Sequence, residues 1–139
     1  MSDRHDSFEL RPIGHVRSSL RTRAQAPLQG AEGAPDATLQ FVSELAAGVT
    51  DLRPGQELLV LTWLHLADRE TLRVHPRGNP LNEEEGVFST RSPDRPNPIG
   101  VHRVTVVAAD GCSIRVRDLE AIDGTPILDV KPVLHPRER

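Results

Sequence analysis

Two Asp-Gly pairs divide the last third of the chain into three segments in which apolar and polar residues alternate. The pairs are Asp110-Gly111 and Asp123-Gly124, and the segments cover residues 99–109, 112–122 and 125–134. Asp-Gly between alternating segments is a strong signal for a tight hairpin turn, because Gly adopts positive φ at no steric cost. The pattern therefore predicts three antiparallel strands joined as a meander.

Three earlier segments also have strand character, at residues 8–16, 39–42 and 57–66. The last one reads ELLVLTWLHL, and this continuous apolar run predicts a strand that is buried on both faces. A helical turn is expected to end at Gly48, and no strand–helix alternation indicates a parallel sheet. The predicted fold class is mainly β: a single-domain antiparallel β-barrel with long loops and one or two short helices.

The chain is long enough for one domain with its own core, since it has 139 residues. We expect a disordered tail at 1–6, the domain at 7–135 and a second tail at 136–139. Residues 17–39 are rich in Ala, Gly, Pro and Gln with little periodicity, which predicts a long loop. Loops of this length are usually functional or disordered.

Composition excludes several classes of protein. The net charge is −3, so no global basic field would attract nucleic acid or acidic lipid. The single cysteine, Cys112, excludes an internal disulfide and a cysteine zinc site, and its apolar surroundings predict a core position. His65, His75 and His102 lack metal-ligand spacing, so no metal is expected. Without a signal peptide or a long apolar span, the expected location is cytoplasmic.

Residues 86–100 read GVFSTRSPDRPNPIG and contain three prolines within six positions. Proline fixes φ, which lowers the entropy cost of holding neighbouring side chains in place. Arg91, Arg95 and Asn97 would then be presented from a stiff backbone, a pattern suited to an anionic or amide-rich ligand. The alternative is a rigid surface loop with solvated arginines.

Residues 123–132 read DGTPILDVKP and form a second candidate. Asp129 and Lys131 are two positions apart, so they share one face of the expected strand. On an exposed face they would form a modest ion pair. In a pocket, Asp129 would be a candidate base or cation partner.

These two stretches together resemble the TsaA/TrmO family. GVFSTRSPDRPNPIG followed by LEAIDGTPILDVKP matches its long central and C-terminal motifs, and FELRPIGHVRS resembles its opening strand. The resemblance implies a single-sheet β-barrel that binds S-adenosyl-L-methionine, pairs as a homodimer and methylates N6 of threonylcarbamoyl-adenosine beside the tRNA anticodon. The implied cofactor contacts are Pro27, Leu28, Gln29, Leu64, His65, Arg91, Val101, Asp123, Gly124, Thr125 and Pro126.

Physical roles can be assigned beside the resemblance. Arg91 can clamp a carboxylate through two hydrogen bonds, and the DGTP turn offers backbone N–H and C=O groups to a purine. Asp129 is the candidate that takes a proton from the acceptor nitrogen. The residues expected to contact the substrate are Arg95, Asn97 and Lys131. Arg69, Arg73, Arg77, Arg91 and Arg95 would form either an RNA-facing patch or ordinary solvated surface.

The acceptor stays open at this point. The family motif usually has a basic residue where this chain has Leu28, and longer members carry a further C-terminal domain. The negative net charge suits tRNA poorly, because binding to phosphates depends on Lys and Arg. The alternatives are methylation of a small molecule and a non-catalytic module that binds S-adenosyl-L-methionine.

Overall fold

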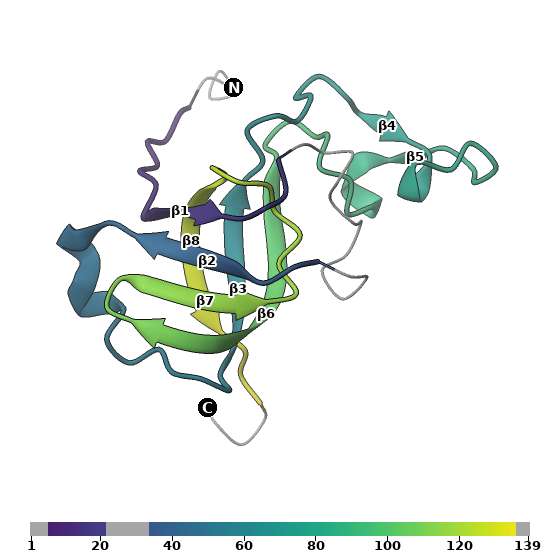
Figure 1. Cartoon of the computed structure of the whole chain (residues 1–139). Coiled ribbons are helices and arrows are strands. Elements are labelled where there is room, and N and C mark those ends of the chain that lie inside the picture. The colour runs from purple at the N-terminus through teal and green to yellow at the C-terminus, as the bar shows by residue number, and fades with distance from the viewer. Residues whose placement is uncertain (1–5, 22–33, 136–139) are drawn as a thin grey trace.

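Six antiparallel strands form a closed ring in a computed structural model that describes residues 6–21 and 34–135 (Figure 1). The order around the ring is β1-β2-β7-β6-β3-β8. In chain order the strands are β1 (Gly14–Arg17), β2 (Ala37–Phe41), β3 (Glu57–Trp63), β6 (Ile99–Asp110), β7 (Ser113–Arg117) and β8 (Pro126–Pro132). The prediction of a mainly β, single-domain chain is confirmed.

The remaining elements are short. A two-stranded ribbon pairs β4 (Arg73–Val74) with β5 (Glu85–Gly86). In Figure 1 this ribbon stands apart from the ring, beyond the end where β3 finishes and β6 starts. The helical segments are 3₁₀ turns: η3 (Ser43–Gly48), η4 (Pro76–Gly78) and η5 (Val87–Ser89). The helical turn ending at Gly48 is confirmed.

Strand β3 alternates instead of being buried on both faces, so that prediction was wrong. Leu58, Val60 and Thr62 are fully buried, while their neighbours in β3 are half-buried. A closed ring has one interior, so a strand in it presents every second residue to the outside. After Glu57, the outward residues of β3 are the apolar Leu59, Leu61 and Trp63, so the sequence alone predicted a doubly buried strand.

The predicted meander is correct for its first turn only. Strands β6 and β7 form a hairpin around Gly111, whose φ is +58°. Strand β8 does not pair with β7: it lies between β3 and β1, and β7 pairs with β2. The predicted strand at 112–122 ends at Arg117, and residues 118–125 carry the chain across the end of the ring.

The core fills the inside of the ring. Leu39, Leu58, Ile114 and Ile127 each have no exposed area, and every one lies on a different strand. Burying such a side chain contributes about 1.5–3 kcal/mol. Cys112 is half-buried and packs against this cluster, so it lies at the edge of the core. The ring is therefore a packed scaffold, and a ligand site has to lie at its ends or outside it.

Candidate functional site

A large cleft lies at the end of the ring where β3 ends and β6 begins. Its volume is about 990 Å³, at the upper end of the usual size of small-molecule sites. Its walls come from the β4–β5 ribbon, the proline-rich loop, the start of β6 and residues 120–122 with Thr125. Segments far apart in the sequence therefore meet at one site.

The proline-rich loop is held in shape by its own arginine. Arg95 donates hydrogen bonds to the carbonyl groups of Val87 and, at 3.0 Å, Thr90. The hydroxyl oxygens of Thr90 and Ser92 each accept a backbone N–H from two residues further along. The loop is therefore a built structure, and Arg95, predicted to contact the substrate, uses these donors to stabilise it.

A second set of hydrogen bonds ties this loop to the segment that follows β3. The Asp94 carboxylate accepts the backbone N–H of Asp68 at 2.9 Å. Arg69 donates to the loop backbone at 2.7 Å and to Asn97 Oδ1 at 3.1 Å. The amide oxygen of Asn97, another predicted substrate contact, is thus occupied by Arg69.

Arg91 faces the cleft as an exposed side chain. Its guanidinium makes a long hydrogen bond, 3.4 Å, to the carbonyl of Val101 on β6. Leu64, His65 and Val101 line the same cleft. The structure therefore brings together four residues that were predicted from separate motifs.

Sequence reasoning missed a buried hydrogen-bonded chain at the cleft wall. Thr62 Oγ1 lies 2.7 Å from His102 Nε2, and His102 Nδ1 lies 2.5 Å from Glu120 Oε1. Thr62 and His102 are buried, and the Glu120 side chain is 19% exposed. Nδ1 can donate its hydrogen to a carboxylate oxygen of Glu120, and in that tautomer Nε2 accepts from the Thr62 hydroxyl.

The glycine that closes PNPIG makes room for this chain. A Cβ atom on Gly100 would lie 2.7 Å from Thr62 Oγ1 and 2.8 Å from His102 Nε2. Both distances are shorter than van der Waals contact, so only glycine fits without displacing the pair. Gly100 in the PNPIG motif was therefore the sequence signal that could have indicated a closely packed residue such as His102. The sequence analysis considered His102 only as a metal ligand.

The DGTP turn anchors the segment that follows β1. The Asp123 carboxylate accepts the Ser18 N–H at 2.9 Å and pairs with Arg21 at 3.3 Å. The backbone N–H groups of Asp123 and Gly124 donate to carbonyls of the β1 region at 2.6 and 2.7 Å, and that of Thr125 donates within the turn. These three N–H groups are engaged inside the protein, which corrects the expectation that they are offered to a purine.

Pro27, Leu28 and Gln29 lie outside the described residues. Of the four DGTP residues, Thr125 lines the cleft. Pro126 begins β8. The turn therefore anchors residues 16–21 to the ring.

Asp129 and Lys131 lie on β8, away from the cleft. Their side chains form an ion pair at 2.9 Å and are 47% and 61% exposed. Of the two alternatives that the sequence left open, this is the exposed ion pair. Neither side chain lines the cleft, and their roles as base and substrate contact stay predictions.

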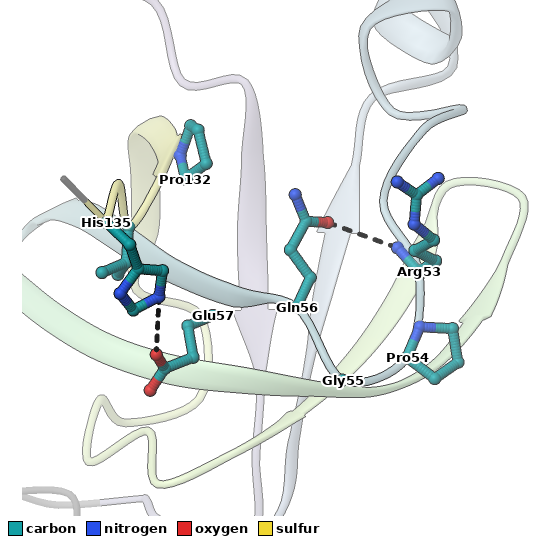
Figure 2. A pocket seen from close by; sticks show the side chains of 8 residues that line it. Arg53, Pro54, Gly55, Gln56, Glu57, Pro132 and His135 are labelled. Atoms are coloured by element: carbon teal, nitrogen blue, oxygen red, sulfur yellow. Dashed lines mark hydrogen bonds and ion pairs between the residues drawn. The ribbon is translucent and has the colours of Figure 1, made fainter. Parts of the chain in front are cut away.

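A second, smaller hollow of about 550 Å³ lies at the opposite end of the ring. Figure 2 shows His135 directed at Glu57 and Gln56 directed at the backbone of Arg53. A hydrogen bond from Arg103 at 3.1 Å, reinforced by its charge, holds the pKa of the Glu57 carboxyl below its usual range. These are exposed ion pairs, so this hollow is the weaker candidate for a site.

Two observations hold for residues 6–21 and 34–135. No helix there is long and apolar enough to cross a bilayer. No three His, Cys, Asp or Glu side chains gather there in a way that could hold a metal ion.

Comparison with known proteins identifies the family. The model of the tRNA-methyltransferase O N-terminal domain matches residues 15–137. A probable S-adenosyl-L-methionine-binding protein of Methanothermobacter thermautotrophicus is 43% identical over 125 residues, covering 90% of this chain and 89% of the relative. An S-adenosyl-L-methionine-binding protein of Archaeoglobus fulgidus is 40% identical, covering 88% of this chain and 86% of its own length.

Solved structures agree with these matches. The crystal structure of TrmO from Pseudomonas aeruginosa superposes with a TM-score of 0.72 at 26% identity. The match covers 93% of this chain and 57% of that one, so the chain spans little more than half of the solved protein. The match over residues 15–137 and the identity to these relatives show that the chain belongs to the family of tRNA-methyltransferase O N-terminal domains.

Proposed function

We propose that this chain is an S-adenosyl-L-methionine-dependent methyltransferase that methylates N6 of threonylcarbamoyl-adenosine in tRNA, next to the anticodon. The observation that carries the proposal is the cleft of about 990 Å³ with the exposed Arg91 on its wall. Relatives named as S-adenosyl-L-methionine-binding proteins share 40–43% of their residues with this chain. The family model carries the methyltransferase name.

The cleft residues fit the chemical groups of the cofactor. Arg91 supplies a forked cationic donor for a carboxylate. Leu64 and Val101 supply apolar surface, and Thr125 lines the same cleft. When bound, the cofactor supplies an activated methyl group on a sulfonium. The protein orients the two reactants and excludes water, which alone contributes up to about 7–11 kcal/mol.

The tRNA acceptor and the homodimer are part of the proposal. Of the five predicted RNA-facing arginines, Arg69 and Arg95 bond to the loop and Arg73 pairs with Glu84 at 3.1 Å. Arg77 and Arg91 line the cleft, where they can meet phosphate. Pairing of two chains would double this local basic surface, and binding to phosphates depends on such Lys and Arg contacts.

The same arginines favour one alternative acceptor. Arginines of this set bond to other groups of the protein, so their contacts with the phosphates of a tRNA would cost those bonds. A small nucleoside or other small molecule could be recognised without that cost. A non-catalytic module that binds the cofactor is the other alternative, and it predicts binding without turnover.

Calorimetric titration with S-adenosyl-L-methionine tests the shared premise. Arg91→Ala should weaken binding at least about tenfold, because a charge-assisted pair contributes about 1.5–3 kcal/mol. Arg53→Ala, an exposed arginine at the opposite end of the ring, is the matched control and should bind as the wild type does. Normal binding by Arg91→Ala would show that the cofactor lies elsewhere.

Transfer of a labelled methyl group then identifies the acceptor. Label in tRNA that carries threonylcarbamoyl-adenosine, and not in tRNA that lacks it, supports the proposal. Label found only in small molecules supports the first alternative, and tight binding with no transfer supports the second.

A further inference from the structure

Glu120 is a partly buried carboxylate on the wall of the cleft. Its side chain is 19% exposed, whereas Glu85 at the rim is exposed and Asp94 is bonded to the Asp68 backbone. Among the described residues, the Glu120 side chain bonds to His102 through one carboxylate oxygen. The carboxylate therefore has hydrogen-bonding capacity left beyond His102 while it lines the cleft.

We infer that Glu120, held by His102, takes the proton from the acceptor nitrogen during methyl transfer. The inference rests on the proposed function, and it assigns the base that the sequence had placed at Asp129. Asp129 is 47% exposed and paired with Lys131 outside the cleft, so Glu120 is the better placed carboxylate.

The step balances with the groups named. The acceptor nitrogen forms a bond to the methyl carbon, and the electron pair of the broken methyl–sulfur bond stays on sulfur. The N–H of the acceptor becomes strongly acidic as the new bond forms. Its proton passes to the Glu120 carboxylate, which later releases it to water.

His102 acts as a positioning residue. It is 4% exposed, so its ring orientation is fixed by packing and by the Thr62 hydroxyl. Its Nδ1–H bonds to one oxygen of Glu120 and thereby orients the carboxylate. Acid–base sites commonly contain such a base held in place by a further residue. Gly100 keeps the space that this ring occupies. The Thr62 hydroxyl has no exposed area, so it cannot reach a substrate as a nucleophile.

A competing role for Glu120 is recognition of the positive sulfonium. That contact would stabilise the bound reactant, whose charge disappears during transfer, so it would raise the barrier instead of lowering it. The two roles differ in a measurable way. A cation partner distinguishes S-adenosyl-L-methionine from the neutral product S-adenosyl-L-homocysteine, and a base does not.

Glu120→Gln is the main test, because its amide oxygen can still accept the Nδ1–H and preserve the fold. We expect kcat to fall by about 10²-fold or more, with calorimetric affinities for both cofactor forms within about threefold of wild type. Glu83→Gln, an exposed glutamate of the ribbon loop, removes the same charge and should keep wild-type kcat. Thermal unfolding of each variant checks the fold.

The pH–rate profile gives a readout that a structural role would not change. In the wild type, kcat should fall at acid pH as Glu120 takes up a proton, and Glu120→Gln should lose that dependence. The other titratable and charged groups that line the cleft are His65, His75, Arg77, Glu85, Arg91, Asp94, Arg95 and His102. All are present in both proteins. His102 contacts Glu120 directly, so the profile of a His102→Asn variant separates its contribution from that of Glu120.

His102 variants separate positioning from packing. His102→Asn keeps a donor near the Nδ1 position and should retain more kcat than His102→Leu, at equal cofactor affinity. Wild-type protein that binds the cofactor and methylates no acceptor overturns both the proposed function and the inference. Normal transfer by Glu120→Gln, or a loss confined to S-adenosyl-L-methionine affinity, overturns the inference alone.

Discussion

Each end of the ring places a carboxylate next to a histidine, and the two pairs differ in burial. At the cleft, His102 Nδ1 lies 2.5 Å from Glu120, with side chains 4% and 19% exposed. At the opposite end, His135 Nε2 lies 3.8 Å from Glu57, with side chains 56% and 37% exposed. Water and salt screen the second pair and reach the first much less. The same two residue types therefore make a fixed structural unit at one end and a loose surface contact at the other.

The largest effect should come from closing the space beside His102. Gly100→Ala would place a Cβ 2.7 Å from Thr62 Oγ1. Forcing an atom into a packed site costs about 1–3 kcal/mol, and the imidazole has to move. Chemical denaturation should show this loss of unfolding free energy. Gly48→Ala, where a Cβ meets nothing within 4 Å, is the control and should stay near wild type.

Removing the buried hydroxyl should have the next largest effect. Thr62→Val keeps the shape of the side chain but leaves His102 Nε2 without its donor, which costs about 1–3 kcal/mol for a buried group. Thr105→Val, a half-buried threonine on β6, is the matched change and should cost less. Equal unfolding free energies for the two variants would show that the Thr62 hydrogen bond contributes nothing.

The smallest effect should come from the exposed pair and should depend on pH. Arg103 lowers the pKa of Glu57 in the folded protein, so the stabilisation is present above the ordinary carboxyl pKa and is lost as the pH falls through the folded value. The difference in unfolding free energy between wild type and Glu57→Gln should thus be small at pH 7 and disappear in acid, once the pH is below the lowered pKa of Glu57. High salt should reduce it at pH 7. If the stability difference between wild type and Glu57→Gln persists in acid and in high salt, the Glu57 pair is as well shielded from solvent as the His102–Glu120 pair.

Much of the fold was predictable because the signals are local. The hairpin of β6 and β7 follows from Asp110-Gly111 and the alternation on either side, since a turn and its flanking strands depend on neighbouring residues. The place of β8 was not predictable. It pairs with β3 and β1, strands more than sixty residues away in the chain, and ring closure decides such partners.

The candidate site also has a part that the sequence predicted and a part that it could not predict. The motifs identified Leu64, His65, Arg91 and Val101, which do line one cleft. Sequence could not show that Arg95 and Asn97 stabilise the loop. Arg95 donates to backbone carbonyls and Asn97 accepts from the Arg69 side chain, and only folding brings these groups near.

The sequence by itself determined the strand signals, the loop stiffened by prolines and the family of the chain, because each depends on residue types at short spacing. Only the tertiary structure decided which carboxylate is enclosed. Glu120 and Asp129 look equivalent in the chain, nine positions apart in one motif. Burial and a hydrogen bond from another strand separate them: the ring turns Glu120 toward a buried imidazole and leaves Asp129 paired with Lys131 in solvent.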